Sequence, residues 1–214
     1  MNKGYFSSRY AYDPRRSTIW RTICKFLQKY IPGNSVILDL GCGYGDFINN
    51  IKAGKKYAVD ISPSSKKHIK KDVVFSQANS TNLKYKKNSF DTVFCSNLFE
   101  HLNRENLNKT ISEIKRVLKP NASLLIIQPN YKYSIKDYFD DYTHELVFTH
   151  ISLKNFLEAN DFEVKQCKKR LLPFSVSSST LIPAFILPFL LKLYLISPIR
   201  PLAKQMFIVA MNKK

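Results

Sequence analysis

A glycine-rich turn directly after a short apolar run constrains the fold of this chain more than any other sequence feature. The run Val36-Ile-Leu-Asp39 is bounded by turn residues, and Gly41, Gly43 and Gly45 follow it. A short apolar run of this kind is typical of a buried parallel strand. Glycines at its end permit a tight turn and a close approach of the backbone to a ligand. The pattern predicts an open α/β sheet, which binds ligands at the carboxyl ends of its strands.

Further short apolar runs alternate with helical patterns along the chain. Apolar residues recur at helical spacing in 17–30, 103–118 and 152–160, and a short helix is expected at 45–51. The remaining expected strands are short apolar segments, at 57–60, 73–77, 92–96, 123–128, 162–172 and 206–211. Strands that alternate with helices imply a Rossmann-like, doubly wound and largely parallel sheet covered on both faces.

The length of 214 residues fits a single domain, 1–214. We expect an N-terminal helical cap at 1–34, a core at 35–172 and 205–214, and an apolar insertion at 173–204.

Prolines interrupt this insertion, and Lys192 lies inside it, so we do not expect it to span a membrane. Short helical pieces should pack against the sheet instead. Residues 175–203 then form an internal cap, a homodimer interface or a peripheral membrane contact flanked by basic residues.

Composition narrows the class of protein. The four cysteines are scattered without disulfide or metal-ligand spacing, and the N-terminus lacks the apolar core of a signal peptide. We therefore expect a reduced, cytoplasmic protein without a metal site, with peripheral contact at the inner face of the membrane as an option. The net charge of +18 allows a nucleic acid, membrane or acidic partner, or simply lysine-rich solvated faces. No basic run interleaved with aromatic residues favours nucleic acid.

Two acidic residues near the glycine turn indicate the type of cofactor. Asp39 can hold a cationic amino group directly or through water. Asp46 stands where the dinucleotide fingerprint has its third glycine, and its charge would repel a diphosphate. Both features suit S-adenosylmethionine, which carries an ammonium and a sulfonium but no phosphate, and they disfavour NAD.

Three polar residues after the next two strands extend this site. Asp60 follows Gly41 by about 20 residues, where an acidic side chain accepts hydrogen bonds from the ribose hydroxyls. Its alternative role is to cap the loop at Ser62. Asn79 can pair with the adenine edge and Ser80 can offer its backbone N–H, although both also fit an ordinary polar loop.

With these residues in place, the sequence resembles the class I S-adenosylmethionine-dependent methyltransferases over about residues 15–172 and the final strand. The resemblance is carried by ordered segments: Val36-Ile-Leu-Asp-Leu-Gly-Cys-Gly-Tyr-Gly-Asp46, Ala58-Val-Asp60, Asn88-Ser-Phe-Asp-Thr-Val-Phe-Cys-Ser-Asn97, Phe99-Glu-His-Leu102 and Glu113-Ile-Lys-Arg-Val-Leu-Lys-Pro120.

This resemblance implies a seven-stranded sheet, mostly parallel with an antiparallel last strand, and the cofactor over the ends of the first four strands. Asn97, after the fourth strand, joins the implied cofactor-binding residues. The sequence departs from the family at Asn79, which replaces a common Asp, and at Asn121 and Asp161, which replace glycines.

A narrower resemblance concerns the acceptor. The segment Tyr138-Phe-Asp-Asp-Tyr-Thr-His144 is similar to methyltransferases of bacterial surface-polysaccharide and nucleotide-sugar pathways. It implies O-methylation of a sugar-like or lipid-linked small molecule or glycan in polysaccharide biosynthesis. A lipophilic acceptor such as a quinone precursor and an inactive cofactor-binding scaffold are the alternatives. Nucleic acid is not expected, because Ser96-Asn-Leu-Phe99 lacks the Asn/Asp-Pro-Pro-aromatic motif of base amino-methylation.

The catalytic candidates are two histidines. Methyl transfer is an in-line displacement that depends on alignment, and an oxygen nucleophile also needs a general base. His144 and His101 are placed for this role, with Asp140 or Asp141 accepting the other N–H of His144. Alternatively, His144 fixes a loop and His101 is structural.

Overall fold

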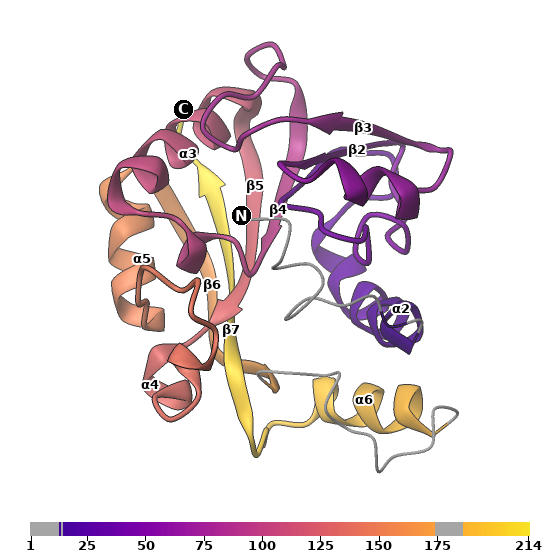
Figure 1. Ribbon diagram of the computed structural model, residues 1–214, viewed down its shortest axis with the longest axis vertical. Coiled ribbons are helices and arrows are strands. Elements are labelled where there is room, and N and C mark those ends of the chain that lie inside the picture. The colour runs from indigo at the N-terminus through magenta and orange to yellow at the C-terminus, as the bar shows by residue number, and fades with distance from the viewer. Residues whose placement is uncertain (1–12, 14, 174–185) are drawn as a thin grey trace.

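The computed structural model describes residues 13, 15–173 and 186–214 (Figure 1), so predictions for 1–12, 14 and 174–185 lie outside the described residues. A seven-stranded sheet of order β3-β2-β1-β4-β5-β7-β6 forms its centre. The strands are β1 (Val36–Leu40), β2 (Lys55–Asp60), β3 (Val73–Gln77), β4 (Phe90–Ser96), β5 (Leu118–Pro129), β6 (Phe162–Pro173) and β7 (Ala203–Asn212). Strands β1 to β5 pair in parallel, whereas β7 runs antiparallel between β5 and β6. The predicted fold class is confirmed.

Helices cover both faces of the sheet because successive strand residues point to opposite sides. Helices α3 (Arg104–Val117) and α5 (His150–Ala159) cover one face, and α2 (Arg15–Leu27) lies on the other (Figure 1). In β1, Leu38 packs toward α3 and α5, while Ile37 packs toward α2. The short helices are α4 (Tyr131–Ser134), η1 (Gln28–Tyr30), η2 (Pro63–His68), η3 (Phe99–His101) and η4 (Tyr138–Asp140).

Side-chain caps set the start of both long helices on the first face. The Asn103 side chain accepts a hydrogen bond from the backbone N–H of Asn106, which begins α3. Thr149 and Ser152 form a reciprocal capping box at the start of α5. Such caps satisfy backbone N–H groups that have no partner inside the helix.

The expected helix at 45–51 is wrong. Residues 45–50 form consecutive turns and Ile51 a bend, although the N–H of Asn49 donates to Gly45 O and that of Ile51 to Phe47 O. Gly45 has a φ of 71°, outside the right-handed helical region. The Asn50 side chain also donates to Asp46 O, and such local bonds compete with a regular helix.

Two departures from the family pattern occupy backbone positions that favour glycine. Asn121, within β5, has a φ of 59°, and Asp161, before β6, has a φ of 60°. Asn and Asp adopt this left-handed region more readily than other non-glycine residues. The turns therefore keep their shape without the usual glycine.

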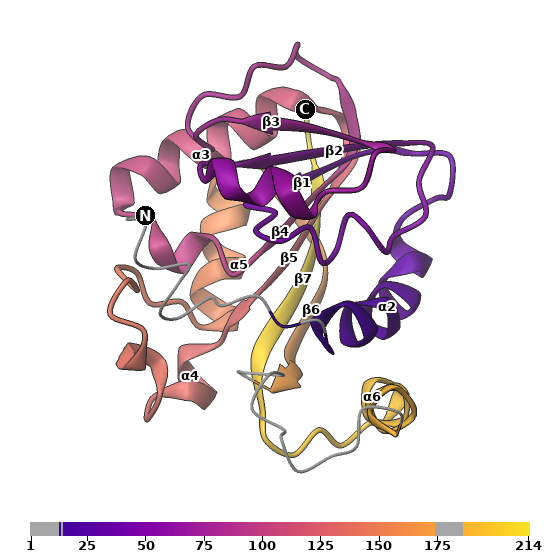
Figure 2. The same ribbon diagram turned by 45° about the vertical axis from the view of Figure 1, so that its right-hand side comes forward.

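Helix α6 (Leu187–Ile196) is the described part of the apolar insertion. Pro188 lies in its first turn, and Pro198 follows its end. We expected this segment to pack against the sheet, but α6 packs against α2, with Leu191 and Leu195 buried (Figure 2). Leu191 and Leu195 belong to the same core cluster as Leu172 of β6 and Phe207 of β7, so this core joins α6, α2 and the sheet.

The opposite side of α6 is apolar and exposed, and includes Phe189, Leu193 and Ile196. None of the helices in the described part of the chain has the length and apolarity that a bilayer crossing requires.

Candidate functional site

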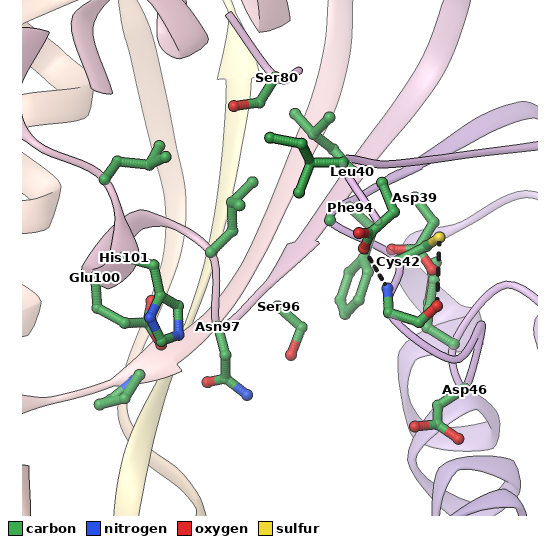
Figure 3. Close-up of a pocket in the computed structure, with 18 of the residues that line it drawn as sticks. Asp39, Leu40, Cys42, Asp46, Ser80, Phe94, Ser96, Asn97, Glu100 and His101 are labelled. Carbon is green, nitrogen blue, oxygen red and sulfur yellow. Dashed lines mark hydrogen bonds between the residues drawn. The ribbon is translucent and has the colours of Figure 1, made fainter. Parts of the chain in front are cut away.

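A pocket of about 760 Å³ opens at the carboxyl ends of the central parallel strands. Its walls come from α2, the glycine turn, the loops after β2, β3 and β4, and the segment between β5 and α5. Figure 3 shows Asp39 and Asp46 on one side, Glu100 and His101 on the other, and Asn97 between them. We call these sides the glycine-turn half and the histidine half.

The glycine turn is held by Asp60. All three glycines have positive φ, 74° at Gly41, 52° at Gly43 and 71° at Gly45. The N–H of Gly43 donates to Asp60 Oδ2 at 2.7 Å, and the N–H of Ser62 donates to Asp60 Oδ1 at 2.8 Å. Asp60 therefore caps its loop, as the alternative from the sequence held. Each carboxylate oxygen accepts more than one hydrogen bond, so capping leaves capacity for a ligand.

Asp39 lies at the bottom of the glycine-turn half. Its side chain is buried, and Oδ2 has no hydrogen-bond partner within the described residues. Burial, and then the charge of Asp60, raise the pKa of the Asp39 carboxyl well above its usual value. A buried carboxylate is stable only when paired, so this oxygen fits a cationic group such as an ammonium.

Arg16 compensates the charge of Asp46. Its Nε donates to Asp46 Oδ2 at 2.8 Å, and both side chains are largely buried. Arg16 was not predicted as a site residue, because α2 and the glycine turn are far apart in the chain. This ion pair weakens the argument that Asp46 alone would repel a diphosphate.

Asn79 and Ser80 line the pocket as predicted, but their side chains already have partners. Asn79 Oδ1 accepts from the N–H of Thr81 at 3.0 Å. Ser80 Oγ is 2.8 Å from Thr110 Oγ1, a hydrogen bond that ties the loop to α3. The side-chain amide of Asn79 can still pair with the adenine edge, and Ser80 can still offer its backbone N–H, as predicted.

Asn97 stands in the pocket between the two halves, with a φ of 50°. Its N–H donates to Ile127 O at 2.9 Å, and its Oδ1 accepts from Gln205 Nε2 at 3.0 Å. Gln205 belongs to β7 and was not predicted as a site residue. Gln205 is too far from Asn97 along the chain for a local sequence pattern to indicate this contact.

The histidine half brings together Glu100, His101 and His144. One ligand atom from each side chain lies within 4.8 Å of those of the other two, and the two imidazole centroids are 4.9 Å apart. Burial raises the pKa of Glu100 to about 8. Burial, and then the nearby His144, lower the pKa of His101 to about 4. The sequence placed both histidines here but missed Glu100, which directly precedes His101, and predicted no metal ligands.

Hydrogen bonds fix the tautomer of both rings. His144 Nδ1 lies 2.6 Å from the carbonyl oxygen of Tyr138, which only accepts, so Nδ1 carries the hydrogen. The Thr143 hydroxyl donates to Asp141 Oδ1 at 2.6 Å and accepts from His101 Nδ1 at 2.9 Å. Nε2 therefore carries the lone pair in each ring.

The predicted role of Asp141 is corrected by this arrangement. The Tyr138 carbonyl holds His144 Nδ1, and the Asp141 carboxylate accepts hydrogen bonds from the backbone N–H and the hydroxyl of Thr143. Asp141 thus acts on His101 through the Thr143 hydroxyl. The carbonyl of Tyr138, at the start of η4, lies beside the His144 ring and accepts this hydrogen bond.

The pocket is acidic although the chain is basic. Eight of the 16 Asp and Glu residues of the chain line it, whereas Arg16 is the single Lys or Arg among the described lining residues. The glycine-turn half has Asp39, Asp46 and Asp60. The histidine half has Glu100, Asp137, Asp140, Asp141 and Glu145. Concentrated carboxylates attract cations and repel anions.

Comparisons with known proteins find similarity to methyltransferases over the central part of the chain. Residues 38–126 match the family model described as a methyltransferase domain. An uncharacterised protein of Methanocaldococcus jannaschii is 34% identical over 130 residues, which are 60% of this chain and 55% of that protein. A ubiquinone/menaquinone biosynthesis C-methyltransferase of Wigglesworthia glossinidia brevipalpis is 32% identical over 124 residues, covering 51% of this chain and 48% of that protein.

The chain thus spans about half the length of these curated relatives. Among solved structures, an S-adenosylmethionine-dependent methyltransferase from Archaeoglobus fulgidus has the same fold, with a TM-score of 0.69 at 18% identity. That match covers 98% of this chain and 100% of the other. It agrees with the strand order and antiparallel β7 described above.

Proposed function

We propose that the chain uses S-adenosylmethionine to methylate a hydroxyl group of a neutral, sugar-like acceptor, since residues 38–126 match a methyltransferase-domain model. The acidic lining of the histidine half is the observation that carries this proposal. Carboxylates accept hydrogen bonds from the hydroxyl groups of a sugar, whereas they repel the diphosphate of a nucleotide sugar. The proposed acceptor is therefore a glycan or lipid-linked sugar.

The glycine-turn half suits the cofactor. S-adenosylmethionine supplies a methyl group bound to a sulfonium. Asp39 Oδ2, buried without a partner in the described part of the chain, fits its ammonium group. Asp60 fits the ribose hydroxyls, and Asn79 and Ser80 the adenine. Asn97, between the two halves, fits the cofactor chain that joins them.

The histidine half supplies the proton acceptor. We assign this role to His144, since the Tyr138 carbonyl holds its Nδ1–H and leaves the basic lone pair on Nε2. The proton of the acceptor hydroxyl passes to that nitrogen as the oxygen becomes the nucleophile. Asp141 and Thr143 position His101 beside it.

A lipophilic acceptor is the second candidate. The similarity to a ubiquinone/menaquinone biosynthesis C-methyltransferase favours it. A pocket half lined by five carboxylates favours the hydroxyl-rich acceptor, because covering carboxylates with an apolar ring removes them from water at a cost in free energy.

The apolar face of α6 suits contact with an anionic membrane, where a lipid-linked acceptor would be found. The exposed Phe189, Leu193 and Ile196 form an apolar surface, and residues 164–214 contain no Asp or Glu but several basic residues. Each Lys or Arg near an anionic surface contributes about 1 kcal/mol of attraction. The location that we propose for the protein is the cytoplasmic side of the membrane.

An acceptor screen tests the proposal. The full chain is incubated with methyl-labelled S-adenosylmethionine and, separately, with neutral glycans, lipid-linked sugars, nucleotide sugars and quinone precursors. Label in the neutral or lipid-linked sugars, lost with Asp39→Asn, is the expected result. Preferential labelling of nucleotide sugars or quinone precursors contradicts the acceptor assignment. Failure to bind S-adenosylhomocysteine in calorimetry contradicts the cofactor site itself.

A further inference from the structure

We propose that Glu100, His101 and His144 form a site for a divalent metal ion such as Mn²⁺. Their ligand atoms lie within 4.8 Å of one another. A bound ion needs its ligand atoms about 2.1 Å away, so small side-chain rotations bring all three to one centre. Two imidazoles and one carboxylate form a mixed N/O set that suits first-row divalent metals and leaves coordination positions open.

The hydrogen bonds around both rings match those of metal-binding histidines. A ligating imidazole usually donates its other N–H to a carbonyl or carboxylate, which fixes the ring and its tautomer. His144 Nδ1 donates to the Tyr138 carbonyl, and His101 Nδ1 donates to the Thr143 hydroxyl, which is held by Asp141. Both rings are therefore oriented through Nδ1, and Nε2 is the donor atom for a metal.

The burial of Glu100 supports a metal site independently of the two histidines. Its side chain is completely buried, and neither carboxylate oxygen has a hydrogen-bond partner within the described residues. A buried carboxylate left without a partner is costly, whereas a cation shared with two imidazoles compensates its charge.

The surrounding charge favours a cation at this place. Asp140, Asp141 and Glu145 line the same half of the pocket, and no Lys among the described lining residues opposes them. Asp137 is compensated by an ion pair with Lys204 of β7. In a chain of net charge +18, this half is an acidic cavity that attracts divalent cations.

The role of the ion, unlike its binding, rests on the proposed function. The bound ion coordinates the acceptor hydroxyl and lowers its pKa. The hydroxyl proton passes to water, the oxygen bonds to the methyl carbon, and the sulfonium sulfur keeps the electron pair of the broken C–S bond. His144 then acts as a ligand, and the general-base role belongs to the metal-free enzyme.

Mn²⁺ binding is measured on the full chain, freed of metal by dialysis, without cofactor or acceptor. Electron paramagnetic resonance of free Mn²⁺ counts the bound ions. One ion per chain is expected, with spin-echo modulation from two histidine nitrogens. Glu100→Gln and His101→Gln should each weaken binding at least tenfold, whereas His150→Gln, outside the pocket, serves as the matched control. Absence of Mn²⁺ binding by the native chain, or bound Mn²⁺ without nitrogen modulation, overturns the site.

Methylation assays then separate this inference from the proposed function. Activity lost with a chelator and restored by Mn²⁺ supports the catalytic role. Full activity in excess chelator supports the proposed methyltransferase function but contradicts a catalytic role of the metal ion. Mn²⁺ binding without methylation of any acceptor retains the site and contradicts the proposed function.

Discussion

At the scale of single residues, Asp39 is expected to link ligand binding at the proposed cofactor site to the release of a proton. A carboxyl whose pKa is raised by burial favours the neutral form while the pocket holds no cation. A cationic ligand reverses this preference, because the ionised carboxylate then has a partner. Protonation, stability and ligand binding are therefore linked at one side chain.

We expect binding of S-adenosylhomocysteine, which carries the same ammonium group, to release up to about one proton from Asp39. Without ligand, the Asp39 contribution to stability is present at low pH and is lost as pH rises through the raised folded pKa. Calorimetry in buffers of different ionisation enthalpy measures the release. Asp39→Asn should abolish it, whereas equal release by that variant and the native chain refutes the assignment.

The Asp60–Gly43 contact predicts two losses of binding. Asp60→Ala removes the acceptor of the Gly43 N–H and the proposed acceptor of the ribose hydroxyls, so it should weaken cofactor binding by about 1–3 kcal/mol. Gly43→Val should abolish binding, because a β-branched residue is strained at a φ of 52° and fills the turn. Calorimetric titration measures both. Native affinity in both variants would place the cofactor elsewhere.

The general-base role of His144 predicts a change in kcat. His144→Ala should lower kcat about 10²–10⁴-fold, with cofactor affinity nearly unchanged. An effect confined to KM would make His144 a residue that positions the acceptor. His101→Ala in the same assay shows whether the neighbouring ring is the base instead.

At the scale of elements, local patterns predicted more than long-range contacts. The sequence located the glycine turn, Asp39 and Asp60 because strand, turn and strand end are neighbours in the chain. It did not predict the Arg16–Asp46 ion pair or the approach of Glu100 to His144, since tertiary packing brings these segments together. Helix α6 lies against α2 for the same reason, as its apolar pattern shows which face is buried but not the partner.

Helix α6 predicts membrane binding. Full-length protein should sediment with anionic liposomes at low salt and much less at high salt, because its basic residues are screened. Leu193→Glu and Ile196→Glu, on the exposed face, should remove this binding. If the protein is a homodimer in solution and binds neither anionic nor neutral liposomes, the exposed face of α6 is assigned to the subunit interface. If it is a monomer and binds neither, both roles of this face are contradicted.

At the scale of the whole molecule, the sheet depends on β7. This strand pairs with both β5 and β6, and Met206, Phe207 and Ile208 are completely buried. A chain that ends at residue 202 should therefore lose cooperative thermal unfolding and near-UV circular dichroism. Removal of residues 213–214 alone, beyond β7, is the control and should lower stability by less than about 1 kcal/mol. Native-like unfolding of the shorter chain would show that β6 does not need its neighbour.

The position of β7 also orders events during synthesis. Strand β6 leaves the ribosome before β7, but its only described route into the sheet is through β7. Until β7 emerges, the edges of β5 and β6 present unpaired backbone groups, which are open to pairing with other chains.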